Sequence, residues 1–513
     1  MEKTEWRKLW RRLWPVLVLL IYIALNFFLV SRHENWRDEA QAWQIARLTD
    51  WKGLFAQLKY EGHPVLWYLV LMPFAKGGFP FEWMGLISLA LMSVAAWLLI
   101  RKAPFAVPVK LLLLFSPFFV YYYPVVSRSY SLVPPILAAL AVVYPKRKEK
   151  PILYGVLIAL LSQTHIYMVA VSFMLSFAWL CETAADAFKG RRENAAVIKR
   201  NICGLGISLA SALFLIWELI GSTGANTGID ISPAATVSSN LHRISVGAEW
   251  AVNFALGIWM SDEFWAFLKI VLIVCALVLI VFSFEEGLIF TIAAFLQVLM
   301  FTYVYLPSEQ KAILVVHELI FTVWVVLEKR RREELARPLP ALRALPGDRE
   351  GVRDIYVFLQ RTAWQAALVI MAAVAYYGHN SFIREDVDQA YSASKDIAEY
   401  IDENVPEDAV IAAAGYYTAY PIAAYLPERE IYYPPLEDIL TYAVWNDERN
   451  TYITVDEMLE RIGERYPDCT GFYLISCGSD NVSDVSGLEG ATLLLEVDAM
   501  LSEESASLYY VEL

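Results

Sequence analysis

An Asp-Glu pair followed by a His-Pro pair is the part of this sequence best suited to chemistry. Asp38 and Glu39 come directly after the first long apolar segment, and His63 and Pro64 follow about 25 residues later. Ionisable side chains at a membrane face are costly to remove from water, so they are candidates for function. A carboxylate in this position could serve as a general base, and an imidazole could bind or transfer a proton. The pattern indicates an active site close to a membrane surface.

Other polar residues stand where later apolar segments end. Arg128 and Tyr130 follow the third segment, His165 follows the fifth, and Lys311 precedes the tenth. In the topology predicted below, these ends share one membrane face with Asp38. A guanidinium can bind phosphate through two hydrogen bonds, and phenol and imidazole groups can also donate them. The set suits acid–base chemistry on an anion.

Each of these residues also has a structural interpretation. Asp38 and Glu39 could complement the dipole at a helix N-terminus, and His63 could cap or pack against a helix. Arg128 could extend its head group to the membrane interface, and His165 could be a hydrogen-bonded intramembrane histidine. The His-Pro pair behind the two carboxylates favours a functional role for Asp38 and leaves the other assignments open.

The composition is that of a protein that crosses a membrane many times. Hydrophobic residues make up 58% of the 513 and charged residues only 19%. A helix needs about 20 predominantly apolar residues to span a bilayer. The first apolar run follows a basic arm, but no small-residue cleavage site follows it, so we expect it to be retained as a span. We predict eleven spans, at roughly residues 14–30, 83–100, 108–124, 128–144, 151–165, 166–182, 202–220, 263–283, 287–306, 312–328 and 359–377.

Basic residues orient these spans, because cytoplasmic loops carry an excess of Lys and Arg. Placing every basic cluster inside puts the N-terminus in the cytoplasm and, with an odd number of spans, the C-terminus outside. The clusters are the N-terminal arm and residues 101–110, 146–150, 189–200 and 329–353.

Residues 32–82 are then expected to form one extracytoplasmic loop that holds the candidate site. The apolar stretch from Pro64 to Phe74 is too short to cross a bilayer. We predict short amphipathic helices near 38–48 and 51–59, and a partly immersed helix from Pro64 to about Lys76. Residues 221–262, rich in Gly, Ser, Thr and Asn, are expected to form a second exterior loop.

The last part of the chain has a different character. Residues 378–513 contain 28 Asp and Glu against 6 Lys and Arg, a net charge of −22, so residues 1–377 carry +9 of the total of −13. Alternating helix-like and strand-like segments predict a soluble α/β domain there. Cys469 and Cys477 could form a disulfide or remain thiols. We therefore expect an α-helical polytopic membrane domain followed by an extracytoplasmic α/β domain, and the acidic balance argues against a nucleic-acid partner.

Three motifs resemble the GT-C class of integral-membrane glycosyltransferases, which includes protein O-mannosyltransferases and bacterial aminoarabinose transferases. Asp38-Glu39-Ala40 is similar to the acidic pair after their first span. Gly62-His63-Pro64-Val65-Leu66-Trp67-Tyr68 resembles their Pro-rich motif, with Val65 in place of a second Pro. Arg128-Ser129-Tyr130 is similar to their Arg-x-Tyr motif. Two tail segments also resemble exterior domains of bacterial members, namely Tyr391-Ser392 and Tyr442-Ala443-Val444-Trp445-Asn446-Asp447-Glu448-Arg449.

The resemblance implies a polyprenyl-phosphate sugar as donor and an acceptor hydroxyl on the extracytoplasmic face. Asp38 is then expected to be the general base. Glu39 is the second expected catalytic residue and could orient the acceptor, pair with Arg128 or join His165 at a metal site. His165 is expected to contact the substrate or a metal. Many members have Arg-His in a late exterior turn where this chain has Gln310-Lys311. The expected donor-phosphate ligands are His63, Arg128, Tyr130 and Lys311.

Several points stay open at this stage. Mg²⁺, Mn²⁺ or Zn²⁺ could bind oxygen and imidazole ligands, although no spacing demands a metal. The acceptor could be a glycolipid, a cell-wall polymer or a protein, and inversion at the sugar is expected only from the resemblance. The alternative functions are a transporter or flippase of a lipid-linked saccharide, and a non-catalytic assembly protein whose acidic tail binds a partner. No internal repeat supports a transporter.

Overall fold

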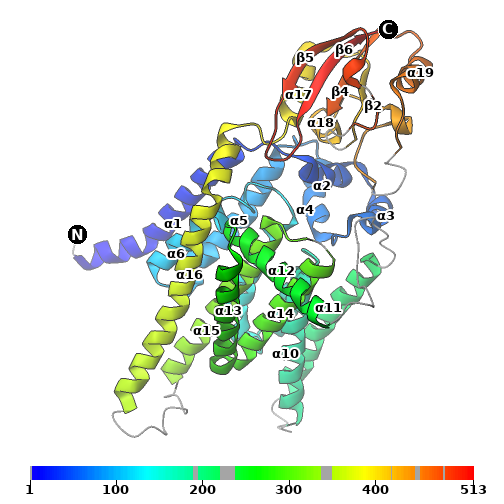
Figure 1. The fold of residues 1–513 in the computed structure, drawn as a ribbon. Helices are drawn as coiled ribbons and strands as arrows, with labels where there is room; N and C mark the ends of the chain where they lie inside the picture. Colours follow the sequence, from blue (N-terminus) through cyan, green and yellow to red (C-terminus); the bar gives the residue numbers. More distant parts are fainter. Residues whose placement is uncertain are drawn as a thin grey trace.

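The computed structural model combines a bundle of long helices with a sheet domain at one end of it (Figure 1). The sheet domain holds the C-terminus, and a layer of short helices lies between it and the bundle. The structure describes residues 3–188, 195–219, 237–304, 306–336, 349–416, 419–444, 451–477, 480–483 and 485–513.

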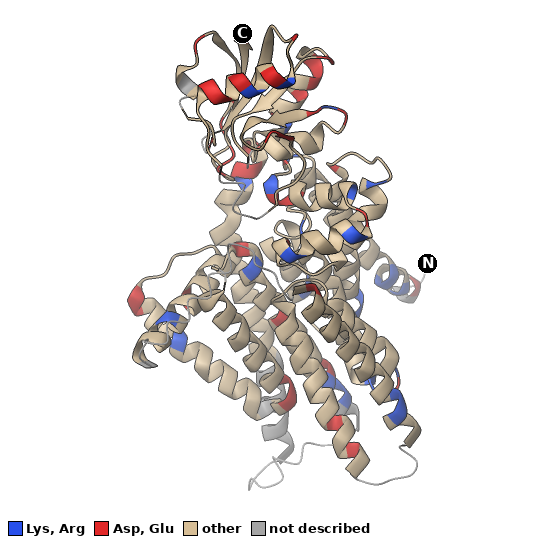
Figure 2. Cartoon of the chain, turned by 90° about the vertical axis from the view of Figure 1, so that its right-hand side faces the viewer, with Lys and Arg blue, Asp and Glu red and all other residues tan. Residues whose placement is uncertain are grey.

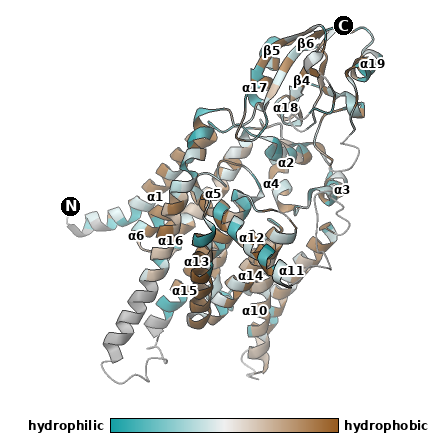
Figure 3. Cartoon of the chain, in the orientation of Figure 1, coloured by the Kyte–Doolittle hydropathy of each residue, from teal (hydrophilic) through white to brown (hydrophobic). Residues whose placement is uncertain are grey.

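Long apolar helices confirm the prediction of a polytopic α-helical membrane protein. Among the described residues, eight helices are long and apolar enough to cross a membrane. Figure 3 shows hydrophobic residues along most of the bundle and hydrophilic ones gathered in the layer and sheet above it. The membrane orientation of the two termini stays a prediction. The eight helices are α1 (Lys3–Val30), α5 (Trp83–Lys102), α10 (Met168–Phe188), α11 (Ala195–Leu219), α13 (Asp262–Phe282), α14 (Phe284–Tyr303), α15 (Glu309–Ala336) and α16 (Arg349–Asp388).

Three of the eleven expected spans are not single long helices. Residues 108–124 divide into α6 (Val107–Leu114), α7 (Pro117–Val120) and a turn segment, because Ser116 before Pro117 is extended (ψ 159°). Residues 128–144 form a 3-10 turn and α8 (Val133–Val143), and 151–165 form α9 (Pro151–Ser162). Within the stretch expected as an exterior loop, α12 spans Val237–Leu256. Hydropathy finds apolar segments but does not locate the bends inside them.

The three short helices predicted after the first span are confirmed. They are α2 (Arg37–Leu48), α3 (Trp51–Glu61) and α4 (Leu66–Ala75). Helix α4 has ten residues, about 15 Å at 1.5 Å per residue, which is half the hydrocarbon thickness of a bilayer. It therefore cannot cross as a helix.

The C-terminal region is a mixed six-stranded sheet with helices, which confirms its α/β class. The strand order is β3-β2-β1-β4-β6-β5, with β1 parallel to β2 and β4 and the other pairs antiparallel. Cys469 and Cys477 lie at opposite ends of β4 and do not form a disulfide with each other. The elements are α17 (Ser394–Asn404), β1 (Ile411–Ala413), α18 (Ala419–Tyr425), β2 (Ile431–Tyr433), β3 (Asp438–Ile439), α19 (Val455–Arg465), β4 (Gly471–Cys477), β5 (Ala491–Val497) and β6 (Ala506–Glu512).

The sheet domain rests directly on α2. The Gln41 amide donates to the Ala443 carbonyl and accepts from the Ala443 N–H, both at 2.7 Å. The Tyr420 hydroxyl donates to the Arg37 carbonyl at 3.2 Å. Side chains of α2, α4, α18 and β1 share one hydrophobic core. Figure 2 shows acidic residues concentrated over this sheet domain and few charges along the bundle helices.

Candidate active site

The candidate residues meet where the short-helix layer joins the bundle. The first turn of α2 carries Asp38 and Glu39. Gly62 ends α3 in the left-handed conformation (φ 64°), which allows the chain to turn sharply into His63 and Pro64. The turn segment 121–128, between α7 and α8, delivers Arg128.

Asp38 and Arg128 form the central ion pair of the site. Arg128 Nη1 lies 2.6 Å from Asp38 Oδ2, and the two side chains are 19% and 29% exposed. Partial exposure matters because a ligand can reach these groups, and water screens their attraction less than at an open surface. The guanidinium also lies 5.5 Å from the Tyr130 ring centroid. Two of the predicted residues therefore act as a pair.

Three aromatic rings form one wall beside this pair. The His63 and His165 rings meet edge to face at 5.2 Å, and the Tyr130 ring stacks on His165 at 4.7 Å. The Tyr130 hydroxyl and His165 Nε2 are buried without a hydrogen-bond partner among the described residues. Buried polar atoms normally have partners. These two are therefore candidates for contacts with a substrate.

His63 is neutral at physiological pH. Burial and the nearby Arg128 charge lower its pKa to about 4. Its Nδ1 lies 2.7 Å from the Glu61 carbonyl, so Nδ1 carries the proton and Nε2 keeps a lone pair. A neutral ring with an accepting nitrogen suits a hydroxyl better than the phosphate contact expected from the sequence.

Lys311 reaches the same region from the start of α15. Its ammonium donates to the Leu306 carbonyl at 3.2 Å. It interacts electrostatically with Asp38 and Arg128, and the two histidines feel its charge. A second cation therefore lies near the ion pair, as the sequence suggested.

Glu39 has a different environment from its neighbour Asp38. It is fully buried, and its carboxylate accepts from Ser127 N at 2.5 Å and Trp36 N at 3.1 Å and contacts His33 Nε2 at 3.2 Å. These contacts replace the expected pairing with Arg128 or a shared metal with His165. Adjacent carboxylates thus have separate environments, because consecutive helical residues point in directions about 100° apart.

Glu61, which the sequence motifs did not single out, is a further carboxylate close to Asp38. Its carboxylate accepts from Gln41 at 2.7 Å and from Gln57 at 2.9 Å, and Tyr68 donates at 3.4 Å. Burial raises its pKa to about 7. Its place immediately before Gly62-His63-Pro64, at the end of an amphipathic helix, was the signal that could have found it.

Among the described residues, no group of three or more His, Cys, Asp or Glu side chains is placed to hold a metal ion.

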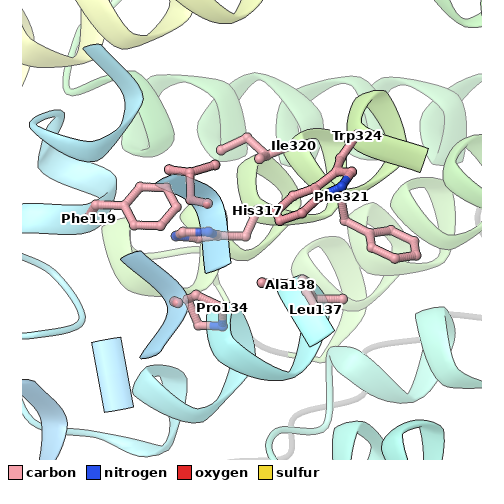
Figure 4. Close-up of a pocket in the computed structure, with 10 residues that line it drawn as sticks. Phe119, Pro134, Leu137, Ala138, His317, Ile320, Phe321 and Trp324 are labelled. Atoms are coloured by element: carbon pink, nitrogen blue, oxygen red, sulfur yellow. The ribbon is translucent and has the colours of Figure 1, made fainter. Parts of the chain in front are cut away.

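A small cavity inside the bundle is distinct from this site (Figure 4). It measures about 20 Å³, and apart from His317 its lining is apolar, including Phe119, Leu137 and Trp324. His317 Nε2 lies 3.2 Å from the Phe118 carbonyl. A space of this size holds about one water molecule, so it cannot hold a sugar.

Part of the chain matches a protein-family model, and the whole chain is similar to solved structures. The family described as "Domain of unknown function (DUF6311)" matches residues 69–259, a segment with Arg128, Tyr130 and His165 but without Asp38 or His63. No curated protein sequence matches the chain. The chain is similar to ArnT from Cupriavidus metallidurans bound to undecaprenyl phosphate, at 11% identity and a TM-score of 0.49, over 97% of this chain and 98% of that one. The chain is also similar to the apo structure of ArnT from Cupriavidus metallidurans, at 11% sequence identity and a TM-score of 0.48, over 97% of each chain. Likeness at this level carries no argument about chemistry.

Proposed function

We propose that this protein is a membrane glycosyltransferase that moves a sugar from a polyprenyl-phosphate donor to an acceptor hydroxyl. The observation that carries the proposal is the partly exposed Asp38–Arg128 pair at the end of an apolar bundle. A carboxylate and a guanidinium side by side offer a base for a hydroxyl and a ligand for a phosphate. The long apolar helices around the site suit a donor that carries a polyprenyl chain.

The chemistry follows from these two groups. The donor phosphate competes with Asp38 for the Arg128 guanidinium, which binds phosphate through two parallel hydrogen bonds. Asp38 is then available to accept the proton of the acceptor hydroxyl. The acceptor oxygen forms a bond to the anomeric carbon as the bond from that carbon to the phosphate oxygen breaks. The phosphate leaves with the electron pair, and a single displacement inverts the anomeric centre.

Neighbouring residues can bind the leaving phosphate and the hydroxyl groups of the sugar or acceptor. Lys311 adds positive charge where the phosphate leaves. The neutral His63 and the Tyr130 hydroxyl, which has no partner among the described residues, suit hydroxyl groups on the sugar or acceptor. The sheet domain, bonded to α2 through Gln41, covers this end and is proposed to help select a glycolipid, cell-wall polymer or protein acceptor.

We further propose that residues 1–377 form the catalytic membrane domain and 378–513 the extracytoplasmic domain, with the N-terminus in the cytoplasm. Helix α16 continues past residue 378 to Asp388. The sheet domain thus follows the last span without a separate linker.

The test is transfer by the purified protein from a panel of labelled polyprenyl-phosphate sugars to membrane extract. Loss of the base in Asp38→Asn is expected to lower the rate by about 10²- to 10⁴-fold. Glu399→Gln, an exposed change on α17, is the control and should keep full activity. Full activity of Asp38→Asn would contradict the base assignment. Movement of an intact lipid-linked saccharide across vesicles without transfer would favour the transporter alternative.

A further inference from the structure

His33, which the proposed reaction does not use, lies buried between two carboxylates from distant parts of the chain. Its Nε2 is 3.2 Å from Glu39 Oε2, and its Nδ1 is 3.0 Å from Asp386 Oδ2, near the end of α16. All three side chains are at most 2% exposed. Each nitrogen faces a carboxylate, and a neutral imidazole has only one N–H. The geometry therefore favours the doubly protonated, positively charged ring.

Glu39 connects this cation to the ion pair of the site. Its other oxygen, Oε1, accepts from the backbone N–H of Ser127. The next residue, Arg128, reaches Asp38, the residue before Glu39. Two consecutive residues of α2 therefore hold two consecutive residues of the turn segment 121–128.

Asp386 holds the other end of the same turn segment. The Tyr121 hydroxyl donates to Asp386 Oδ2 at 2.6 Å. The His33 ring also meets the Tyr391 ring edge to face at 4.5 Å, where α16 gives way to the sheet domain. The chain Glu39–His33–Asp386–Tyr121 thus spans the turn segment from its first residue to Ser127.

We propose that His33, as an imidazolium between Glu39 and Asp386, is a positioning residue that sets Arg128 opposite Asp38 and ties this arrangement to the end of α16. The proposal deepens the proposed function, since the arrangement serves donor binding. A bare imidazolium in this interior would be strongly disfavoured, and the two carboxylates provide the compensating charge.

The pKa of His33 and the titratable groups around its ring agree with this positioning role. Burial alone would lower the pKa of His33, but Asp386 and Glu39 raise it to about 10. The titratable groups around the ring are Glu39 of α2, Asp386 of α16, Tyr121 of the turn segment, and the flanking Glu34 and Tyr391.

The test compares His33→Gln and Asp386→Asn with His379→Gln. His379 is a second buried histidine, on α16, that contacts Tyr122 of the same turn segment and the Ala255 carbonyl, but no carboxylate among the described residues. It therefore controls for the loss of a buried histidine contact without the loss of the charged bridge. The contacts of His33 with Glu39 and Asp386 form a bridge that His33→Gln and Asp386→Asn each break. We expect both bridge variants to raise the KM for the polyprenyl-phosphate donor by about tenfold with a smaller change in kcat. The double variant should raise the KM no further than either single variant, because each substitution already breaks the same bridge. A fall in kcat alone, additive effects, or an equal KM change in His379→Gln would overturn the proposal.

A second measurement does not depend on transferase activity. The apparent melting temperature of the wild-type protein is expected to fall as pH rises from about 6.5 to about 10, because in this window the folded protein keeps a proton on His33 that the unfolded chain has lost. His33→Gln should show a smaller fall, and His379→Gln should follow the wild type. An identical profile in His33→Gln would overturn the bridge. If no donor supports transfer but the melting-temperature profiles differ as expected, the result supports the bridge and contradicts the proposed function.

Discussion

Arg128 Nη1 and Asp38 Oδ2 lie 2.6 Å apart, which joins the turn segment 121–128 to the first turn of α2. Neither group is fully buried, so the pair can open when a ligand supplies another anion. A fully buried pair would have to leave an uncompensated charge behind on opening. The relationship between these residues therefore suits a site that exchanges one anion for another.

Arg128→Lys is expected to weaken donor binding while leaving the fold intact. Lysine keeps the charge but loses the planar two-pronged contact with phosphate. The KM for the donor should rise about 10- to 100-fold, the equivalent of one charged hydrogen bond. Arg47→Lys, at an exposed residue that contacts the Pro427 carbonyl, is the matched control. An unchanged KM would show that Arg128 does not bind the phosphate.

Tyr130→Phe is expected to lower transfer activity with little change in the stability of the fold. The Tyr130 hydroxyl is buried without a partner among the described residues, so its removal should change the free energy of unfolding by less than about 0.5 kcal/mol. Transfer should fall about tenfold if the hydroxyl contacts substrate. Tyr123→Phe is the comparison, because the Tyr123 hydroxyl donates to the Gln310 carbonyl at 2.8 Å and its loss should cost about 1 kcal/mol. Unchanged transfer by Tyr130→Phe would remove Tyr130 from the site.

Glu61→Gln is expected to change how stability depends on pH. The pKa of Glu61 is raised by burial from 4.5 to about 7. Between these values the folded state binds a proton that the unfolded state has lost, so stability falls as pH rises through this window. The apparent melting temperature of Glu61→Gln should fall less than that of the wild type between pH 4.5 and 7, whereas Glu399→Gln should match the wild type. Parallel profiles for Glu61→Gln and wild type would contradict the assignment.

Gln41→Ala is expected to loosen the sheet domain from α2. The substitution removes both hydrogen bonds with Ala443 and the one with Glu61. The Ala443 carbonyl keeps Gln57 as a donor at 3.0 Å, so the buried Ala443 N–H is the backbone group that must find another partner. The cost should be about 1–3 kcal/mol, visible as faster limited proteolysis of the C-terminal region. Gln44→Ala provides a control on the same helix, since the buried Gln44 Oε1 has no partner among the described residues. Equal proteolysis of the two variants would show that this contact does not hold the domain.

Much of the architecture could be predicted because its signals are local. Apolar length predicted the long helices, and the alternation of helix-like and strand-like segments predicted most of the sheet domain. Helix α2 was predicted from residue 38 and begins at Arg37. The break at Ser116-Pro117 and helix α12 were missed, because both interrupt segments whose overall composition suggests something simpler.

The residue types of the site were also readable from the sequence alone, and so was the gathering of Asp38, His63, Arg128, Tyr130, His165 and Lys311 in one region of the molecule. Only the tertiary structure separated Asp38 from Glu39. Their difference is burial, which depends on Ser127, His33 and the distant Asp386 rather than on neighbouring residues. The oxygens of Glu39 are occupied by buried partners, whereas Asp38 faces a partly exposed arginine. Side-chain environment, which long-range packing creates, decided this difference between the two carboxylates.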